Sequence, residues 1–223
     1  MDSLRDLAAW PFIHGFLFVT LALFPIVNPM GMAPIFLNYT ESLDEAVAGS
    51  LARRVAINAF ILTAASLIVG PLALKFFGLS LSAVRVAGGL VLAGAGWHLL
   101  GQGQGDSKHR APPASQEEVL GGAFYPLTLP LTIGPGSIAI MVTVGSSLLT
   151  SPGSILLDGL GALLGLACVS FLIYLCYGQG EHVLRKLGPT GINVLLRLSA
   201  FILLCIGVQI ALEGYTAFLA GRP

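Results

Sequence analysis

The chain has 223 residues, of which 55% are hydrophobic and only 10% are charged, and its mean hydropathy is +0.86. Because about a quarter of the residues in soluble domains are charged, this composition predicts an integral membrane protein. The net charge is zero at pH 7, which excludes the basic surface of a nucleic-acid-binding protein and leaves the lipid bilayer as the expected partner.

Six apolar segments are long enough to cross a membrane, which takes roughly 20 apolar residues. They are 12–38, 54–76, 81–100, 121–149, 154–178 and 192–218. Between the third and the fourth lies a polar stretch rich in glycine and proline, which has the composition of a linker. We therefore predict an all-α membrane protein with three spans in residues 1–100, a polar linker over 101–120 and three spans in 121–223.

Two sets of prolines with identical spacing lie in the first span of each half. They are Pro25, Pro29 and Pro34 and, 101 residues later, Pro126, Pro130 and Pro135. Proline removes a backbone donor and clashes with the preceding turn of a helix. Because each half has an odd number of spans, the second half enters the membrane from the opposite side. The sequence thus predicts two inverted three-helix repeats whose first and fourth helices are discontinuous.

The prolines leave backbone carbonyls without donors one turn earlier. Those carbonyls belong to Leu21, Pro25, Met30, Gly122, Pro126 and Leu131. Irregular backbone at membrane depth is tolerated only where protein buries it or where it lines a polar cavity. Asn28, Thr128 and Thr132 are close enough in sequence to satisfy freed groups. The N–H groups of a half-helix suit a carboxylate, and free carbonyls suit an ammonium or a cation, so the two breaks could hold a zwitterion.

Residues beside the prolines are expected to depart from regular helical geometry. Asn28 and Gly134 precede prolines and are biased away from helical dihedral angles. Gly31, Gly134 and Gly136 allow conformations or close approaches that are closed to other residues. Kinked helices that merely pack together are the alternative interpretation.

Other glycines predict close helix packing rather than a site. Gly161 and Gly165 are expected to pack the fifth span on a neighbour. The third span carries Gly88, Gly89, Gly94 and Gly96, for which we expect the same role.

Titratable residues are scarce in the apolar segments. Asp158 and Glu213 are the carboxylates there, and both lie near segment ends. His14 and His98 also lie near span ends, where an interfacial location explains them better than metal binding or a proton relay. Asn58 and Gln209 lie deeper, and each could face a cavity or bond to another helix. The chain has no hydrolase or ATPase motif, so we expect no enzyme, no cofactor and no metal site.

Orientation follows from the Lys and Arg residues in the connections. Seven are expected on the side of the central linker: Arg53, Arg54, Lys108, Arg110, Arg185, Lys186 and Arg197. Four are expected on the other side: Arg5, Lys75, Arg85 and Arg222. The excess predicts a cytoplasmic central linker with both termini outside.

The segments Phe24-Pro-Ile-Val-Asn-Pro-Met-Gly-Met-Ala-Pro34 and Pro126-Leu-Thr-Leu-Pro-Leu-Thr-Ile-Gly-Pro-Gly136 resemble the signature of the MarC family of six-span membrane proteins. The resemblance extends to Arg85-Val-Ala-Gly-Gly-Leu, Arg197 and Gln209-Ile-Ala-Leu-Glu-Gly214. It implies a secondary transporter of small neutral amino acids such as glycine and alanine, in the plasma (inner) membrane of a bacterium or archaeon. In the family, the discontinuous first and fourth helices surround the substrate. This implies a substrate site at Asn28, Pro29, Gly31, Pro34, Thr132, Gly134, Pro135 and Gly136.

We expect transport by alternating access around the two breaks. The coupling ion is open between Na⁺, which carbonyls alone can hold, and H⁺, for which the scarcity of carboxylates is unfavourable. The alternatives are an exporter of another small solute or of a cation, and a non-transporting membrane scaffold or regulator. Neutral walls argue against multivalent cations, whose selectivity normally uses carboxylate rings. The sequence leaves the oligomeric state and the direction of transport open.

Overall fold

The computed structural model describes residues 2–41, 43–101, 121–150 and 155–221. Within these ranges the chain is helical and contains no strand. The helices are α1 (Asp2–Val27), α2 (Pro29–Thr40), α3 (Glu45–Phe77), α4 (Leu81–Gly101), η2 (Ala123–Thr132), α6 (Pro135–Thr150) and α7 (Ile155–Leu219). The predicted all-α class is confirmed for the described part of the chain.

Five helical segments are long and apolar enough to cross a membrane: Trp10–Val27, Glu45–Phe77, Leu81–Gly101, Leu156–Gly180 and Thr190–Leu219. A sixth candidate is the pair Ala123–Thr132 and Pro135–Leu148, which is bent by 72°. The chain is therefore an all-helical membrane protein with five or six candidate spans. The predicted segment 12–38 overlaps two helices, α1 and α2, and the predicted segment 121–149 overlaps η2 and α6.

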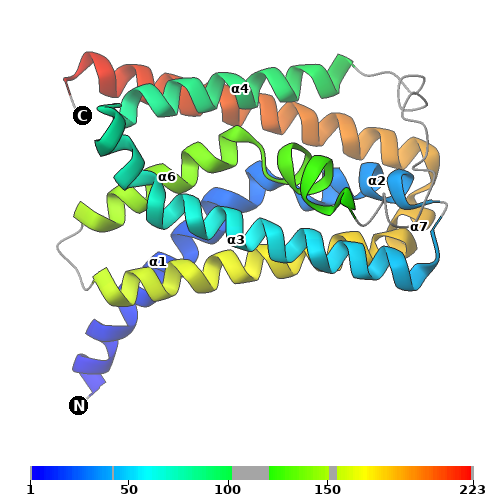
Figure 1. Ribbon diagram of the computed structural model, residues 1–223, viewed down its shortest axis with the longest axis horizontal. Helices are drawn as coiled ribbons and strands as arrows, with labels where there is room; N and C mark the ends of the chain where they lie inside the picture. The colour runs from blue at the N-terminus through cyan, green and yellow to red at the C-terminus, as the bar shows by residue number, and fades with distance from the viewer. Residues whose placement is uncertain (1, 42, 102–120, 151–154, 222–223) are drawn as a thin grey trace.

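The helices run back and forth along one long axis (Figure 1). α1 and the first part of α7 run from the left end towards the right, whereas α3 and α6 run from right to left. α4 lies beside the last part of α7, which runs in the opposite direction. Both chain termini lie at the left end, and α4 ends at the right. Successive segments thus alternate in direction, as the segments of a multi-pass membrane protein must.

Gly188 divides α7 into its two parts. Its backbone has φ 67° and ψ 174°, a combination that is essentially restricted to glycine. The helical segments on either side, Leu156–Gly180 and Thr190–Leu219, are separate candidate spans. The glycine therefore permits the reversal between the last two spans.

Replacing Gly188 with alanine should destabilise the protein by about 1–3 kcal/mol, because a Cβ makes this backbone conformation unfavourable. The measurement is thermal unfolding in detergent, followed by intrinsic fluorescence. Gly178→Ala is the matched control, because its Cβ would meet only the Tyr174 ring at 3.9 Å. Equal unfolding temperatures for the two variants would contradict the prediction.

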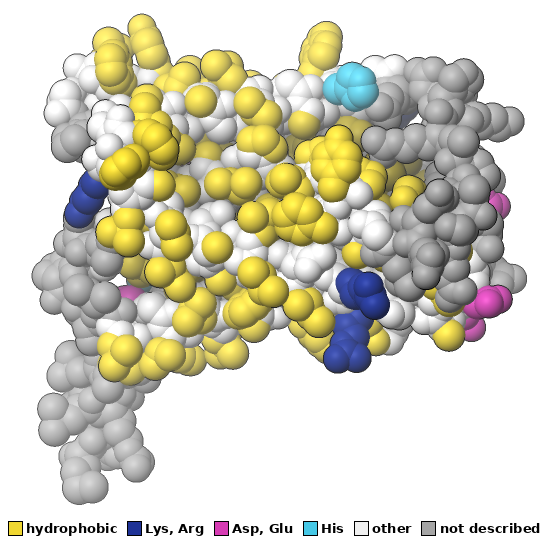
Figure 2. Space-filling model, viewed as in Figure 1, with side chains coloured by type: hydrophobic (Ala, Val, Ile, Leu, Met, Phe, Trp, Pro, Cys, Tyr) yellow, Lys and Arg dark blue, Asp and Glu magenta, His cyan; other side chains and the backbone are white. Residues whose placement is uncertain are grey.

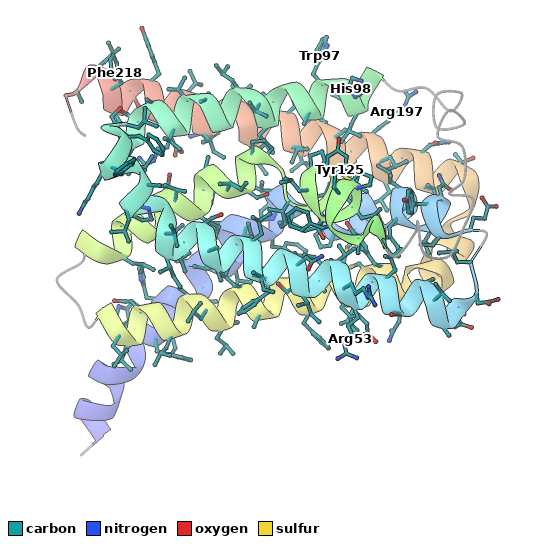
Figure 3. The ribbon with its side chains drawn as sticks, in the orientation of Figure 1. Arg53, Trp97, His98, Tyr125, Arg197 and Phe218 are labelled. Atoms are coloured by element: carbon teal, nitrogen blue, oxygen red, sulfur yellow. The ribbon has the colours of Figure 1, made fainter. Side chains whose placement is uncertain are left out.

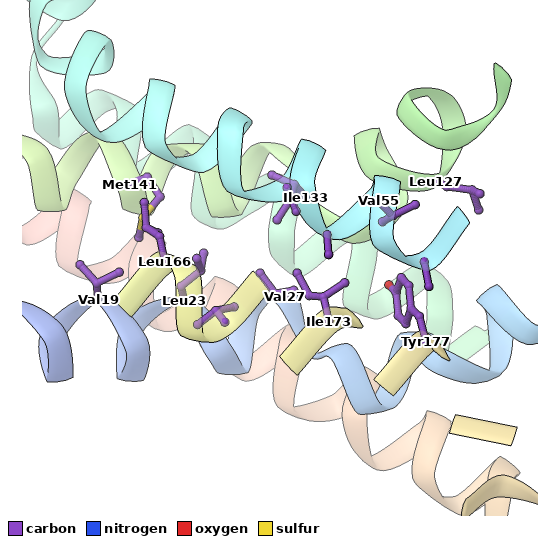
Figure 4. Close-up of a cluster of buried hydrophobic side chains, with 14 of the residues drawn as sticks. Val19, Leu23, Val27, Val55, Leu127, Ile133, Met141, Leu166, Ile173 and Tyr177 are labelled. Carbon is purple, nitrogen blue, oxygen red and sulfur yellow. The ribbon is translucent and has the colours of Figure 1, made fainter. Parts of the chain in front are cut away.

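The core lies where α1, α3, α6 and α7 meet (Figure 4). Each of these helices contributes apolar side chains that are at most 2% exposed, and η2 adds another. They include Val19, Leu23, Val27, Val55, Leu127, Met141, Leu166, Ile173 and Tyr177. This core fixes the positions of α1, which contains Pro25, and of η2, which contains Pro126 and Pro130.

Large apolar side chains cover much of the outer surface. Figure 2 shows hydrophobic side chains over most of one face, with few charged groups. Trp97 is 71% exposed and Phe76 is 84% exposed. Large exposed apolar side chains are expected where lipid, rather than water, surrounds a helix. The surface therefore supports the membrane location predicted from composition.

Glycines bring helix backbones into contact at two interfaces. A Cβ on Gly89 or Gly96 of α4 would meet the backbone of α7, at Gly207 O and Leu204 N respectively, with both distances 2.6 Å. A Cβ on Gly165 would lie 2.8 Å from the Phe16 carbonyl of α1. The predicted packing role is confirmed for these glycines and for Gly161 and Gly88, which meet Phe12 and Ala139. It is wrong for Gly94, whose Cβ would face open space.

Candidate functional site

Asn28 is the single residue between α1 and α2. Its φ of 45° and ψ of 58° are left-handed, a conformation that asparagine adopts more readily than most residues. Proline at position 29 disfavours the right-handed helical conformation at Asn28. Asn28 Oδ1 accepts a hydrogen bond from the Gly31 N–H at 3.2 Å. The Asn28 N–H donates to Phe24 O at 2.9 Å. Asn28 thus ends one helix and caps the next, and its predicted role in satisfying freed backbone is confirmed.

The second proline set produces a different backbone. Tyr125 (φ −124°, ψ 122°) and Leu129 (φ −114°, ψ 124°) are extended, and each precedes a proline. Thr128 Oγ1 donates to Ala123 O at 2.7 Å, and Thr132 Oγ1 donates to Leu127 O, also at 2.7 Å. The two threonine hydroxyls therefore bond to carbonyls five residues earlier, those of Ala123 and Leu127, and not to the carbonyls of Gly122, Pro126 and Leu131 that the sequence predicts to be freed.

Two details of the predicted breaks are wrong. The Gly122 carbonyl is not stranded, because the wider turns of η2 bring the Leu127 N–H to it at 3.2 Å. The two sets of prolines are also not matched throughout. Pro34 lies inside α2, whereas Pro135 opens α6 after the 72° bend. What the halves share is a non-helical residue before the middle proline, Asn28 in one and Leu129 in the other.

The site glycines differ in how tightly they are packed. A Cβ on Gly31 would lie 2.6 Å from Ser199 Oγ of α7, and one on Gly136 would lie 2.9 Å from Leu92 Cβ of α4. The predicted close approaches are confirmed at both. Gly134 has no left-handed backbone, and its Cβ would meet only Pro130 O at an ordinary 3.6 Å. The glycine-specific conformation or close approach predicted for Gly134 is therefore wrong, and its carbonyl accepts a hydrogen bond from the Ile138 N–H of α6 at 3.3 Å.

Tyr177 of α7 joins the two groups of predicted site residues. Its hydroxyl lies 3.0 Å from Thr132 Oγ1 at the end of η2. Its ring stacks on Phe36 of α2, with centroids 4.5 Å apart. Both rings are at most 1% exposed. The structure thus links α2, which follows the first break, to the end of η2.

The remaining predicted residues lie along these same helices. Pro29 and Pro34 are buried in α2, Thr132 is buried at the end of η2, and Pro135 is exposed at the start of α6. Pro135 O would lie 3.8 Å from a Cβ on Gly88 of α4. The predicted site residues of α2 therefore face α7, whereas those at the end of η2 and the start of α6 face both α4 and α7.

Sequence reasoning missed Tyr177, Phe36 and Ser199. All three lie in apolar helices without a motif, so nothing local in the sequence marks them.

Of the residues whose roles the sequence did not decide, Gln209 is exposed and its Nε2 donates to Glu213 Oε1 at 2.8 Å. Asn58 is half-buried in α3 and His98 is exposed. Figure 3 shows the outward direction of Trp97 and Arg53 on opposite sides of the bundle.

Replacing Thr132 with valine should destabilise the protein by about 1–3 kcal/mol, since it leaves the Leu127 carbonyl and the buried Tyr177 hydroxyl without this partner. Tyr177→Phe removes only one of these two bonds and should cost less, about 0.5–1.5 kcal/mol. Unfolding in a denaturing-detergent titration measures both. A larger loss for Tyr177→Phe would contradict this assignment of the bonds.

The polar groups around the breaks are uncharged. They are the Asn28 amide, the hydroxyls of Thr132, Tyr177 and Ser199, and the backbone N–H groups of Gly136 and Ser137 in the first turn of α6, since Pro135 has no N–H and the Ile138 N–H donates to the Gly134 carbonyl. Among the described residues, no three His, Cys, Asp or Glu side chains gather as metal ligands would. Such surroundings suit a neutral or zwitterionic ligand better than an ion of high charge.

The sequence matches the MarC family of integral membrane proteins over residues 13–219, a range that holds both proline sets and all eight predicted site residues. The chain belongs to the MarC family. The resemblance seen in the two proline segments is thereby confirmed.

Relatives within the MarC family come from bacteria and archaea. The membrane protein YvbG of Bacillus subtilis is 33% identical over 85% of this chain and 89% of its own length. A membrane protein of Methanocaldococcus jannaschii is 34% identical over 91% of this chain and 96% of its own. The inner membrane protein MarC of Citrobacter koseri is 30% identical, over 87% and 90%. No solved structure matches the chain.

Proposed function

We propose that this protein is a secondary transporter that moves small neutral amino acids, such as glycine and alanine, by alternating access. The observation that carries the proposal is the pair of non-helical residues, Asn28 and Leu129, 101 residues apart and each directly before a proline. Discontinuous membrane helices with exposed half-helix ends are a recurrent way to build a substrate site near the middle of a transporter. In the proposal, α1 with α2 and η2 with α6 each form one broken span.

The directions of the helices support an inverted repeat of residues 1–100 and 121–223. If each broken pair is one span, the six spans alternate in direction, and the fourth begins at the end opposite to the first (Figure 1). The last spans of the two halves, α4 and the end of α7, pack antiparallel, as two elements related by a two-fold axis in the membrane plane would. One half would then rock against the other around the site.

The chemistry of the site supports a small zwitterion as the substrate. The carboxylate would bind at N–H groups of the first turn of α6, and the ammonium would bind freed carbonyls and hydroxyls near Asn28 and Thr132. The close contact of Gly31 with Ser199 leaves little room for a large side chain. This is the reason to place glycine and alanine first among the substrates.

The proposed orientation places the central linker in the cytoplasm and both termini outside. Arg53 and Arg197 lie in the right half of the bundle (Figure 3), whereas Lys75 lies in the last turn of α3 and Arg85 near the start of α4. Arg85 is only half-exposed, and its Nε donates to Thr143 Oγ1 of α6 at 3.5 Å. A cysteine accessibility assay on intact cells, with single cysteines in the linker and at the C-terminus, tests the orientation.

Counterflow in liposomes tests transport itself. Proteoliposomes loaded with unlabelled glycine should take up labelled glycine transiently, and alanine inside should do the same. Saturable counterflow supports the proposal. Uptake of a labelled divalent cation instead would favour a cation exporter, and the absence of any saturable flux would favour a membrane scaffold.

A further inference from the structure

Ser199 carries a buried hydroxyl that the rest of the protein leaves unpaired. It lies in the last part of α7, where it is 9% exposed. Within the described part of the chain, no residue forms a hydrogen bond with its Oγ. Most buried polar side-chain atoms have a partner, and an unpaired one is unfavourable. A ligand that pairs with this hydroxyl would remove that cost.

The side-chain amide of Asn28 brings a second unpaired group to the same point. Asn28 Oδ1 accepts from the Gly31 N–H, but Asn28 Nδ2 has no hydrogen-bond partner among the described residues. A Cβ on Gly31 would touch Asn28 Nδ2 and would lie 2.6 Å from Ser199 Oγ. Because glycine has no side chain, both polar atoms border the surface of Gly31. One comes from the first half of the chain and the other from the second.

Neither of these two atoms is sealed inside the protein. Among the polar side-chain atoms of described residues that are not exposed, Thr20 Oγ1 is the one that is both fully enclosed and unpaired. Ser199 Oγ and Asn28 Nδ2 are unpaired but are not fully enclosed, so each keeps an opening to the space beside it. A small ligand group can therefore reach both atoms.

The chemistry of the two atoms selects an uncharged ligand group. Asn28 Nδ2 can only donate, whereas Ser199 Oγ can both donate and accept. The start of α2 offers few N–H groups to an anion, because Pro29 has none and two later ones in its first turn already bond to Asn28. Two N–H groups remain free in the first turn of α6, so a carboxylate binds better there. A hydroxyl, which accepts one bond and donates another, matches Asn28 and Ser199.

We propose that Asn28 and Ser199 form a subsite for the side-chain hydroxyl of serine, so that serine is bound more tightly than alanine. The inference rests on the proposed transport function and refines its substrate class. The serine hydroxyl accepts from Asn28 Nδ2 and donates to Ser199 Oγ. Glycine leaves the subsite to water, whereas alanine places a methyl group against two polar groups that then lack a partner.

This subsite lies close to the first turn of α6, where the substrate carboxylate is proposed to bind. One apolar cluster connects the two places, and its buried members are Ile26, Leu92, Leu203 and Ile210. The cluster includes the residue two positions before Asn28 and the residue one helical turn after Ser199. It also includes Leu92, which lies against Gly136 of α6. The hydroxyl subsite and the carboxylate site thus border the same cluster.

The alternative is that Ser199 serves packing alone. Small residues let membrane helices approach each other closely, and Ser199 lies where α2 meets α7 through Gly31. In a packing role, the hydroxyl itself has no function, and a change at Ser199 would affect all substrates alike. In the proposed role, a change at Ser199 affects serine and leaves substrates without a hydroxyl almost untouched.

Competition for glycine counterflow in proteoliposomes separates the two roles. The competitors are L-serine, L-alanine and L-2-aminobutyrate, in which a methyl group replaces the serine hydroxyl. In the wild-type protein, serine should inhibit at about three- to tenfold lower concentration than either of the others, the effect of one net hydrogen bond. Ser199→Ala should bring serine and L-2-aminobutyrate within about twofold of each other, with glycine and alanine changed less than about twofold.

Two further variants make the comparison sharper. Ser170→Ala is the matched control, because Ser170 is a serine of the first part of α7 with the same 9% exposure. It should keep the full preference for serine. Ser199→Cys retains nearly the same volume but has a weaker donor and acceptor, so most of the preference should be lost. This variant keeps the test decisive if Ser199→Ala does not fold.

Each outcome decides between specific claims. Wild-type glycine counterflow without an advantage of serine over the other two competitors would overturn the subsite and leave the transport function standing. An advantage that survives in folded Ser199→Ala or Ser199→Cys would also overturn it. An equal loss for all competitors in Ser199→Ala would overturn it in favour of packing. The absence of any saturable glycine flux in the wild type would instead overturn the transport function, and the subsite with it.

Discussion

Gly31→Leu is expected to lower glycine counterflow more than tenfold. Gly31 lies in the first turn of α2, where its N–H donates to Asn28 Oδ1. A Cβ there would meet the Asn28 side chain and would lie 2.7 Å from Ser199 Cβ. A leucine side chain must therefore push α2 away from α7 or push Asn28 out of its capping position. Either movement disturbs the break that carries the proposed site.

The control for this variant is Gly94→Leu on α4, because nothing lies within 4 Å of a Cβ at that position. It changes an exposed glycine of a membrane helix to the same side chain and should leave counterflow within about twofold of wild type, since surface changes away from packed contacts have small effects. Counterflow of Gly31→Leu at the level of Gly94→Leu would show that the break at Asn28 is not part of the site.

A double variant tests whether Ser199 limits the space at Gly31. Gly31→Ala should cost about 1–3 kcal/mol of stability through overpacking. Ser199→Gly removes both Ser199 atoms that the new methyl group would meet, so the pair of changes should recover part of that loss, with a coupling of at least about 0.5 kcal/mol. Additive losses would mean that Ser199 does not limit the space at Gly31.

Local chemistry made the first break predictable from sequence. Proline restricts the residue before it, and asparagine is among the few residues that adopt a left-handed conformation while capping a helix. Both effects act within a few residues of Asn28, so they are readable without knowledge of the fold. The same holds for Thr128 and Thr132, whose hydroxyls reach carbonyls five residues away.

The form of the second break was not predictable in the same way. Proline at 34 and proline at 135 have the same sequence spacing to their neighbours, yet Pro34 lies within α2 and Pro135 opens α6. Whether a helix bends at a proline depends on which neighbours bond to the freed carbonyl and how the next helix packs. In the second half, the five-residue bonds of η2 settle the outcome, and they involve tertiary support from Tyr177.

Burial of Asp158 was also beyond sequence reasoning, which placed this residue near the end of a span. The carboxylate is covered because α1 approaches the start of α7 closely, and that approach depends on Gly15 in a different part of the chain. The contacts of Phe36, Tyr177 and Ser199 likewise involve residues far away in the sequence, so these residues could be recognised only in the structure. Contacts between distant segments determine which of these side chains are buried or paired, whereas composition and residue spacing predict only the helices.

Gly161→Leu should cause the largest loss of stability, about 3 kcal/mol or more, the upper end for overpacked sites. Gly161 lies against the Phe12 carbonyl, with Phe16 N 3.0 Å from the position of a Cβ. The obstacle is the backbone of α1, so no side chain can rotate away to make room. α1 can accommodate leucine only by leaving α7, which would open the core at Val19 and Leu166.

Gly159 of the same helix provides the control, because a Cβ there would meet nothing within 4 Å. Gly159→Leu should unfold at or near the wild-type temperature, whereas Gly161→Leu should unfold far below it or fail to purify as a folded protein. Gly161→Ala keeps the test informative in that event, since a single methyl group meets the same Phe12 carbonyl. Because membrane helices associate through close packing rather than through a hydrophobic driving force, equal stability of Gly161→Ala and a matched Gly159→Ala variant would mean that α1 is held to α7 by contacts other than this one.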